Sequence, residues 1–351
     1  MTDENFDIDR FTAIESIKDL IYLHYIAYLP STSFNFEYLL IRFEKMKVLV
    51  ATEKPFAPVA VKGISDVIAE AGYELVLLEK YTSRQELLDA VADVDALIVR
   101  SDIVDAEVID AAKNLKIVVR AGAGYDNIDL EAATARGIVV ENTPGQNSNA
   151  VAELVFGMTV MAVRNMFNGT SGTELKDKSL GIHAFGQVGR NVARIAKGFG
   201  MEVSALDPYC PASAMVEAGV KPIGEIRDLY ANNQVVSLHI PATPETRGSV
   251  GYDLITLMPK GGVLVNTARK EVIDEEGLER ALTDRPDLKY VADIRPGNAD
   301  RLAELFPGRV FFTPKKMGAQ TAEANINAGI AAARQTVAYL RAGIDRFRVN
   351  K

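Results

Sequence analysis

Apolar and polar positions follow a regular order along the first half of the chain. Short runs of consecutive apolar residues alternate with longer segments whose apolar residues recur at helical spacing. The runs are rich in valine, isoleucine and leucine and do not alternate with polar residues. This is typical of strands buried on both faces of a parallel sheet. The strands predicted in this way are KVLVA (47–51), ELVLL (74–78), ALIVR (96–100), KIVVR (116–120) and GIVVE (137–141).

The same alternation begins again after a long predicted helix from about Asn149 to Arg164. A final helical segment, TAEANINAGIAAARQTVAYLRAG (321–343), closes the series. Two successive βα series predict an α/β protein with two doubly wound parallel-sheet (Rossmann-like) domains and an active site in the cleft between them. The strands of the second series are predicted at 179–185, 202–206, 234–240, 262–266, 289–294 and 310–313.

Composition narrows the range of partners. The 351 residues include 39 Lys and Arg against 47 Asp and Glu, a net charge of −8, and no basic run is present. This balance argues against nucleic acid and anionic membranes as partners. No apolar run reaches the ~18 residues of a membrane span. The single cysteine, Cys210, excludes an internal disulfide framework and fits a reducing compartment, so we expect a cytoplasmic protein.

Residues 1–45 differ from the rest of the chain. They begin with the acidic stretch MTDENFDIDR and continue with aromatic and aliphatic residues of no clear period, after which MKVLVATEKPF reads like the start of a protein. We expect the folded core to begin at Met46. The N-terminal extension is then either an added helical segment or translated upstream sequence, and the sequence favours the second.

The clearest motif is AFGQVG (184–189), between a predicted strand and a predicted helix. It matches the G-x-G-x-x-G pattern of dinucleotide sites, in which Gly186 admits a pyrophosphate and Gly189 lets the helix pack on the strand. Asp207 follows Gly186 by 21 residues and would accept a hydrogen bond from a ribose 2′-hydroxyl, which favours NAD over NADP. Ala184 replaces the first glycine, which is tolerable if its φ stays negative. The alternative is a glycine-bearing turn that binds no ligand.

Several longer motifs carry a resemblance to the D-2-hydroxyacid dehydrogenase family from Met46 to Lys351. They are LIVRSD, VVRAGAGYDNIDLEAATARGIVVENTPGQNSNAVAEL, SLHIPATPETRG, MPKGGVLVNTARKEVIDEEGL and YVADI. The resemblance implies NAD-dependent oxidation of a small 2-hydroxy acid. The pattern is most like that of short members that lack a regulatory domain and act on a phosphorylated substrate, D-3-phosphoglycerate. It also implies a homodimer. The implied domains are a substrate-binding domain of 46–146 and 318–351 and an NAD-binding domain of 147–317.

The resemblance also assigns roles to residues. Arg269 would hold the substrate carboxylate and polarise the reacting oxygen. The implied substrate-binding residues are Arg100, Ser101, Gly122, Ala123, Gly124 and Asn147. The implied cofactor-binding residues are Gly186, Gln187, Val188, Gly189, Asp207, Pro241, Thr246, Ala268 and Asp293. No metal site is expected.

Some of these roles also have a physical basis in the residues themselves. Arg269 follows a strand, where a guanidinium can bind a carboxylate through two hydrogen bonds, although a surface ion pair is the alternative. The same alternatives apply to Arg100. The segment Gly122–Gly124 is either an anion-binding nest of amides or a flexible turn.

The family's catalytic histidine and its partner glutamate are both missing. Lys315 and Lys316 stand at the histidine position and Asn298 at the glutamate position. A lysine base needs its pKa lowered by about 3 units from about 10.4, and burial, nearby Arg269 and the missing glutamate all act in that direction. Lys316 fits better because the following glycine and helix fix its place, but Lys315 remains a candidate. His183 is expected to be a packed core residue.

Two rival functions remain open at this stage. One is the same chemistry on another 2-hydroxy acid, such as glyoxylate or hydroxypyruvate. The other is an NAD-sensing binding protein in which both lysines are exposed turn residues and the site is inactive.

Overall fold

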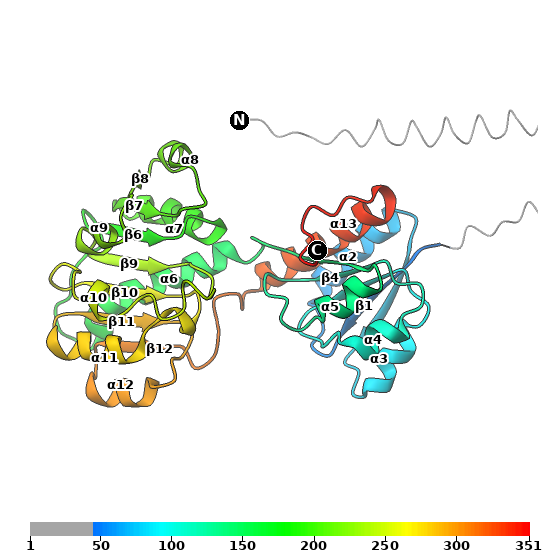
Figure 1. Ribbon diagram of the computed structural model, residues 1–351, viewed down its shortest axis with the longest axis horizontal. Coiled ribbons are helices and arrows are strands. Elements are labelled where there is room, and N and C mark those ends of the chain that lie inside the picture. Colours follow the sequence, from blue (N-terminus) through cyan, green and yellow to red (C-terminus); the bar gives the residue numbers. More distant parts are fainter. Residues whose placement is uncertain (1–44) are drawn as a thin grey trace, which may run out of the picture. The chain divides into compact units, whose positions relative to one another are not determined.

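A computed structural model describes residues 45–351 and shows two parallel sheets, each covered by helices (Figure 1). The interpretations of the N-terminal extension therefore concern residues outside the described part of the chain. The first sheet has five strands in the order β2-β1-β3-β4-β5, all parallel. Its strands are β1 (Lys47–Thr52), β2 (Glu74–Glu79), β3 (Ala96–Val99), β4 (Ile117–Arg120) and β5 (Val139–Asn142).

We call this sheet and its helices the first lobe. The helices are α2 (Pro58–Glu70), α3 (Arg84–Val91), α4 (Ala106–Ala111), α5 (Leu130–Ala135) and α13 (Ala322–Ala342). In Figure 1 the red helix α13 lies against the blue helix α2, from opposite ends of the described sequence. The two helices approach closely, because a Cβ at Gly63 would lie 2.6 Å from Ile330 Cδ1. Three alanines of α13, at positions 328, 332 and 333, join the apolar core on this face of the sheet.

The second lobe is built on a seven-stranded parallel sheet in the order β12-β11-β10-β9-β6-β7-β8. Its strands are β6 (Ser179–His183), β7 (Glu202–Leu206), β8 (Lys221–Pro222), β9 (Val235–Leu238), β10 (Val263–Asn266), β11 (Lys289–Ala292) and β12 (Val310–Phe312). Its helices are α6 (Ser148–Val163), α7 (Gln187–Gly198), α8 (Ala212–Glu217), α9 (Ile226–Ala231), α10 (Tyr252–Ile255), α11 (Glu275–Asp284) and α12 (Ala299–Leu305), with 3-10 turns η2 (Asn165–Phe167) and η3 (Lys270–Val272).

The predicted fold class, two doubly wound parallel sheets, is confirmed. Strand order reverses at β6, which lies between β9 and β7. In such sheets the carboxyl ends of the strands at the reversal are where ligands bind. The AFGQVG motif begins directly after β6 and therefore lies at this point.

The last residues of the chain cover the edge strand β5. Val349 donates its amide to the Val140 carbonyl at 2.8 Å. The Asn350 side chain accepts from the Val140 amide at 2.8 Å and donates to the Ile138 carbonyl at 2.8 Å. Asn350 is 2% exposed. These bonds satisfy backbone groups that an open sheet edge would leave unpaired.

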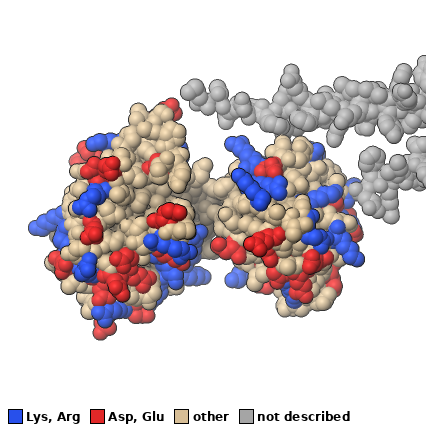
Figure 2. Space-filling view, viewed as in Figure 1, with Lys and Arg blue, Asp and Glu red and all other residues tan. Residues whose placement is uncertain are grey.

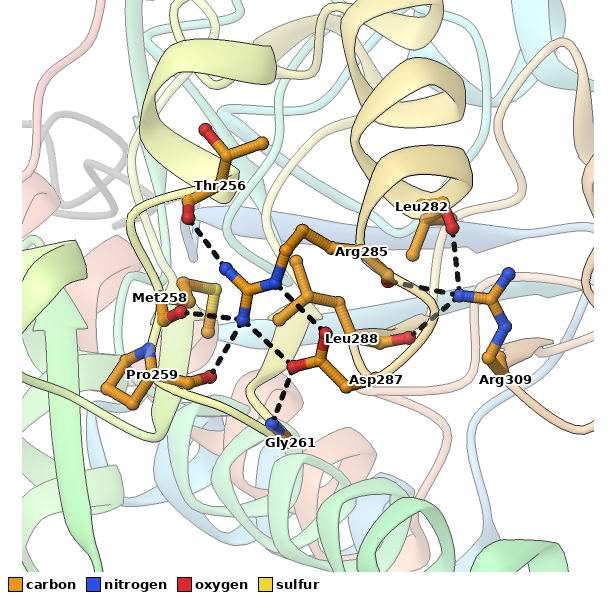
Figure 3. A network of polar contacts seen from close by, with 9 residues as sticks. All are labelled: Thr256, Met258, Pro259, Gly261, Leu282, Arg285, Asp287, Leu288 and Arg309. Carbon is orange, nitrogen blue, oxygen red and sulfur yellow. Dashed lines mark hydrogen bonds and ion pairs between the residues drawn. The ribbon is translucent and has the colours of Figure 1, made fainter.

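A polar network secures the amino ends of β10 and β11, away from the carboxyl edge (Figure 3). Arg285 donates to the carbonyls of Thr256 and Met258, at 2.7 and 3.1 Å, and forms an ion pair with Asp287 at 2.8 Å. Asp287 also accepts from the Gly261 amide at 2.8 Å. Arg285 and this amide hold the pKa of the Asp287 carboxyl below its usual range. The network joins the loops that precede the two strands.

The surface mixes charges of both signs. On the face shown in Figure 2, lysine and arginine lie among aspartate and glutamate, and no large area of one sign is visible. Among residues 45–351, no helix combines the length and apolarity needed to cross a membrane.

Candidate active site

The turn after β6 contains an alanine in the left-handed backbone region. Ala184 has φ +83°, so the condition under which an alanine is easily tolerated at this position, a negative φ, is not met. The reason is the close packing of α7 on β6: a Cβ at Gly189 would lie 2.4 Å from the Ala184 carbonyl oxygen. The chain must turn sharply to bring Gly189 into that position. A left-handed conformation at a residue with a Cβ costs about 1–2 kcal/mol.

The glycine turn and the acid after β7 are connected directly. Asp207 accepts from the Phe185 amide at 2.7 Å and from the Tyr209 amide at 2.8 Å. Gly186 is the N-cap of α7, and a Cβ there would meet no atom within 4 Å. Open space therefore adjoins the N-cap of α7, next to the turn that Asp207 holds. This is the arrangement that a pyrophosphate and a ribose require.

Two histidines lie at the carboxyl ends of neighbouring strands of the second sheet, His183 as the last residue of β6 and His239 directly after β9. His183 contacts the Tyr230 hydroxyl at 3.3 Å, and burial lowers the pKa of His183 to about 4. His239 contacts the Ser237 hydroxyl at 2.9 Å, and burial lowers its pKa to about 3. Both imidazoles are therefore neutral near pH 7. This agrees with the interpretation of His183 as a core residue.

The loop between β12 and α13 carries both lysines, and one carboxylate holds it at both ends. Asp293 Oδ1 accepts from the Thr313 hydroxyl at 2.9 Å and from the Met317 amide at 2.6 Å. Asp293 Oδ2 accepts from the Gly318 amide at 2.8 Å. Asp293 is 1% exposed. Its oxygens are directed at this loop, whereas the contact with a nicotinamide carboxamide expected from the sequence stays a prediction.

Burial and nearby charges act on the Lys316 ammonium. Lys315 and Lys316 are both exposed residues, and the partial burial of the Lys316 ammonium lowers its pKa. The positive charge of Arg269, and to a lesser extent that of Arg120, lowers it further, while Asp293 opposes them. Charges from the carboxyl edges of both sheets therefore act on this amine. These directions are the ones that a lysine base needs.

Arg269 follows β10, and a buried asparagine fixes its turn. Asn266 is fully buried, donates to the Arg269 carbonyl at 2.9 Å and accepts from the Ala268 amide at 2.9 Å. The Arg269 guanidinium donates to the Ala268 carbonyl at 2.9 Å and forms no ion pair with any residue of 45–351. Its charge is therefore not neutralised within the described chain, which argues against the surface ion pair considered above. Asn266 was not among the predicted site residues.

Arg120, at the end of β4, is a further cationic residue that the sequence reasoning missed. Its Nε is buried without a hydrogen-bond partner among the described residues. Burial, and secondarily the charge of Arg100, lowers the pKa of Arg120. A Cβ at Gly122 would lie 1.3 Å from Arg120 Nη1, so the glycine leaves room for the guanidinium. The sequence carried a signal for it, because Arg120 ends the predicted strand KIVVR as Arg100 ends the predicted strand ALIVR.

Arg100 is held by first-lobe loops. Its guanidinium donates to the carbonyls of Lys54 and Pro55, at 2.9 and 3.2 Å, and to Asn325 Oδ1 at 2.6 Å. It also lies 5.1 Å from the centre of the Phe56 ring. Ser101 follows on the exposed side of the same turn.

The remaining predicted residues contribute less direct evidence. The Thr246 hydroxyl donates to the Pro241 carbonyl within their own loop. Asn147 is the N-cap of α6 and makes no side-chain capping bond. Asn298 donates to the Glu275 carbonyl at 3.3 Å and is not among the groups that act on Lys316. No cluster of residues suited to a metal ion occurs within residues 45–351. The other predicted positions lie in turns, namely Ala123, Gly124 and Ala268, or in the first turn of α7, namely Gln187 and Val188.

Comparison with known proteins places this geometry in context. The family model described as "D-isomer specific 2-hydroxyacid dehydrogenase, catalytic domain" matches residues 49–350. A D-3-phosphoglycerate dehydrogenase from Methanocaldococcus jannaschii is 37% identical over 285 residues, which cover 76% of this chain and 54% of that protein. A hydroxypyruvate reductase from Thermotoga maritima is 36% identical over 275 residues, which cover 73% of this chain and 88% of that protein.

Solved structures agree with the sequence comparisons. The crystal structure of NAD+-bound 3-phosphoglycerate dehydrogenase from Entamoeba histolytica has a TM-score of 0.76 and 48% identity to this chain. The match covers 88% of this chain and 99% of that one. The apo-structure of D-lactate dehydrogenase from Escherichia coli has a TM-score of 0.68 and 26% identity.

Proposed function

The chain belongs to the D-isomer specific 2-hydroxyacid dehydrogenase family, and from this premise we propose that it oxidises D-3-phosphoglycerate to 3-phosphohydroxypyruvate with NAD. That reaction would supply a precursor for serine synthesis. The observation that carries the proposal is Lys316, an amine whose pKa is lowered by burial and by Arg269, at the position where the family has a histidine.

The cofactor side rests on the turn after β6. The open space beside Gly186 would admit a pyrophosphate, to which the first amides of α7 would donate. Asp207 retains lone pairs for a ribose hydroxyl and would repel a 2′-phosphate, which favours NAD over NADP. Bound NAD would accept the hydride that leaves C2 of the substrate.

The chemical step would divide between two side chains. Arg269 would hold the substrate carboxylate and polarise the oxygen on C2, since its guanidinium is free of ion pairs with described residues. Lys316, in its neutral form, would take the proton from the C2 hydroxyl as hydride departs. In the reverse direction the protonated Lys316 would return that proton to the oxygen.

The phosphate assignment rests on a second pair of cations. Arg120 and Arg100 lie close enough for the charge of Arg100 to lower the pKa of Arg120. Asp126 acts on Arg120 and Asp102 on Arg100 in the opposite direction, so the two positive charges are already partly offset, and an anion bound beside them would offset them further. A substrate that carries a phosphate as well as a carboxylate would supply that anion, whereas glyoxylate would not.

The proposal is tested by following NADH absorbance with D-3-phosphoglycerate and NAD, and in reverse with phosphohydroxypyruvate, from about pH 6 to about pH 10. Lys316→Ala is expected to lower kcat by about 10²–10⁴-fold, the usual contribution of a general base. NADH affinity should not change. Lys315→Ala is the matched control and should retain most activity.

Other outcomes identify the rivals. Faster turnover of hydroxypyruvate or glyoxylate than of phosphohydroxypyruvate would assign the same chemistry to a smaller acid, as in the relative from Thermotoga maritima. NADH binding without turnover of any of these acids would contradict an enzyme and leave a binding protein.

A further inference from the structure

A buried carboxylate in the first lobe connects the loops that surround Arg100. Asp102 is 4% exposed and lies two residues after Arg100 in the turn that follows β3. Its Oδ2 accepts from the Arg100 amide at 3.2 Å. Its Oδ1 accepts from the Glu53 amide at 2.7 Å and from the Tyr81 hydroxyl at 3.0 Å. Three loops, which follow β1, β2 and β3, therefore meet at one side chain.

These contacts reach Arg100 by two routes. The first is direct, because Asp102 fixes the Arg100 backbone amide. The second runs through the loop after β1: Asp102 holds Glu53, and the next two carbonyls, of Lys54 and Pro55, accept from the Arg100 guanidinium. The backbone amide of Arg100 and the loop that accepts from its guanidinium thus both depend on the Asp102 carboxylate.

The Asp102 backbone extends the connection to the glycine-rich segment. Its carbonyl accepts from the Asn127 side chain at 2.7 Å, and Asn127 lies three residues after Gly124. Tyr81 supports the carboxylate from the other side. Burial, and secondarily Asp102, raises the pKa of the Tyr81 phenol, so it remains a hydrogen-bond donor at physiological pH. A small cavity lined by Glu53, Tyr81, Ser101 and Asp102, among others, adjoins this cluster.

We infer that Asp102, supported by Tyr81, is a positioning residue that sets the orientation of Arg100 toward the substrate anion. This inference rests on the proposed function, in which Arg100 binds the substrate. Asp102 itself is directed at backbone groups and at a phenol, so it acts through Arg100. Its loss should therefore weaken substrate binding more than it slows the chemical step.

The test compares Asp102→Asn, Tyr81→Phe and Arg100→Ala in steady-state assays with D-3-phosphoglycerate, together with NADH titrations. In Asp102→Asn the side-chain oxygen can keep its two donors, Glu53 and Tyr81. The side-chain NH₂ group then faces the backbone N–H of Arg100. KM for D-3-phosphoglycerate should rise on the order of 10-fold, as for a weakened charged contact, while kcat and NADH affinity change little. Tyr81→Phe removes one bond and should shift KM in the same direction by less. Asp105→Asn, at the N-cap of α4, is the matched control and should leave KM unchanged.

A double-mutant cycle separates positioning from general support of the fold. If Asp102 acts through Arg100, the double variant should have the KM of Arg100→Ala alone. Equal and independent increases in KM, or a wild-type KM in Asp102→Asn, would overturn the inference. If Asp102→Asn does not fold, the same cycle with Tyr81→Phe replaces it. A wild-type KM in Arg100→Ala, or an inactive wild-type protein, would instead overturn the substrate assignment and the inference with it.

Discussion

Replacing Asp293 by asparagine tests how the loop with the two lysines is held. An asparagine has one acceptor oxygen where the aspartate has two, and here the two oxygens serve the amides of Met317 and Gly318. Whichever way the amide is turned, its NH₂ group faces one of these N–H groups. The Thr313 hydroxyl can rotate to accept instead of donate, so it is not the limiting contact.

The size of the effect follows from that single lost acceptor. A hydrogen bond to a charged group contributes about 1.5–3 kcal/mol, and a buried donor left unpaired costs about 1–3 kcal/mol. Because the two costs overlap, we expect the free energy of unfolding to fall by about 2–4 kcal/mol. Urea denaturation measures this as a lower midpoint at an unchanged slope. Asp300→Asn is the control, since that side chain is 95% exposed.

The same variant has a second readout in the pH dependence of the rate. Asp293 raises the pKa of Lys316, so removing its charge should lower that pKa. Oxidation needs the neutral amine. The acid limb of the pH–rate profile, where the rate falls as pH drops, should therefore move to lower pH. An unchanged denaturation midpoint would refute the role of Asp293 in holding the loop. A limb that moves to higher pH would refute the electrostatic part of the reasoning.

Three further predictions concern stability. Ala184→Gly should stabilise the fold by about 0.5–1 kcal/mol in urea denaturation, since relief of the left-handed strain exceeds the entropy cost of glycine; a loss of stability would contradict the strain. The pKa of His183 is about 4 in the folded protein and near 6.5 in the unfolded chain, so the free energy of unfolding should fall as pH drops from about 6.5 to about 4. His183→Gln should make the free energy of unfolding depend less steeply on pH in this interval. Asn350→Ala should cost about 2–4 kcal/mol by thermal or urea denaturation, because it leaves the Val140 amide and the Ile138 carbonyl unpaired; no loss would show that water replaces the side chain.

The sheets could be predicted from the sequence because their signal is local. Each strand is a run of consecutive apolar residues, and the repeated βα order implies parallel pairing. Strand β8 was missed because Lys221–Pro222 offers no such run. The family was also recognisable from its motifs, and the match over residues 49–350 confirms it.

Features that depend on contacts distant in sequence could not be predicted. The positive φ of Ala184 follows from how closely Gly189 approaches it, which no propensity records. The charges that act on Lys316 come from residues at the ends of separate strands, which local sequence does not bring together. Arg120 ends a predicted strand and could have been proposed from the sequence, but its closeness to Arg100 depends on the pairing of β3 with β4.

The packing of α13 on the first lobe has a consequence for synthesis on the ribosome. The five strands of that lobe emerge early, but the helix that completes the core on one face emerges only after the entire second lobe. Until then, the face that accepts Ala328, Ala332 and Ala333 is covered only in part, by α2. The second lobe is continuous in sequence and can fold as soon as it leaves the tunnel. The nascent chain should therefore complete its second lobe first, and during that interval the first lobe is the part exposed to chaperones and to aggregation.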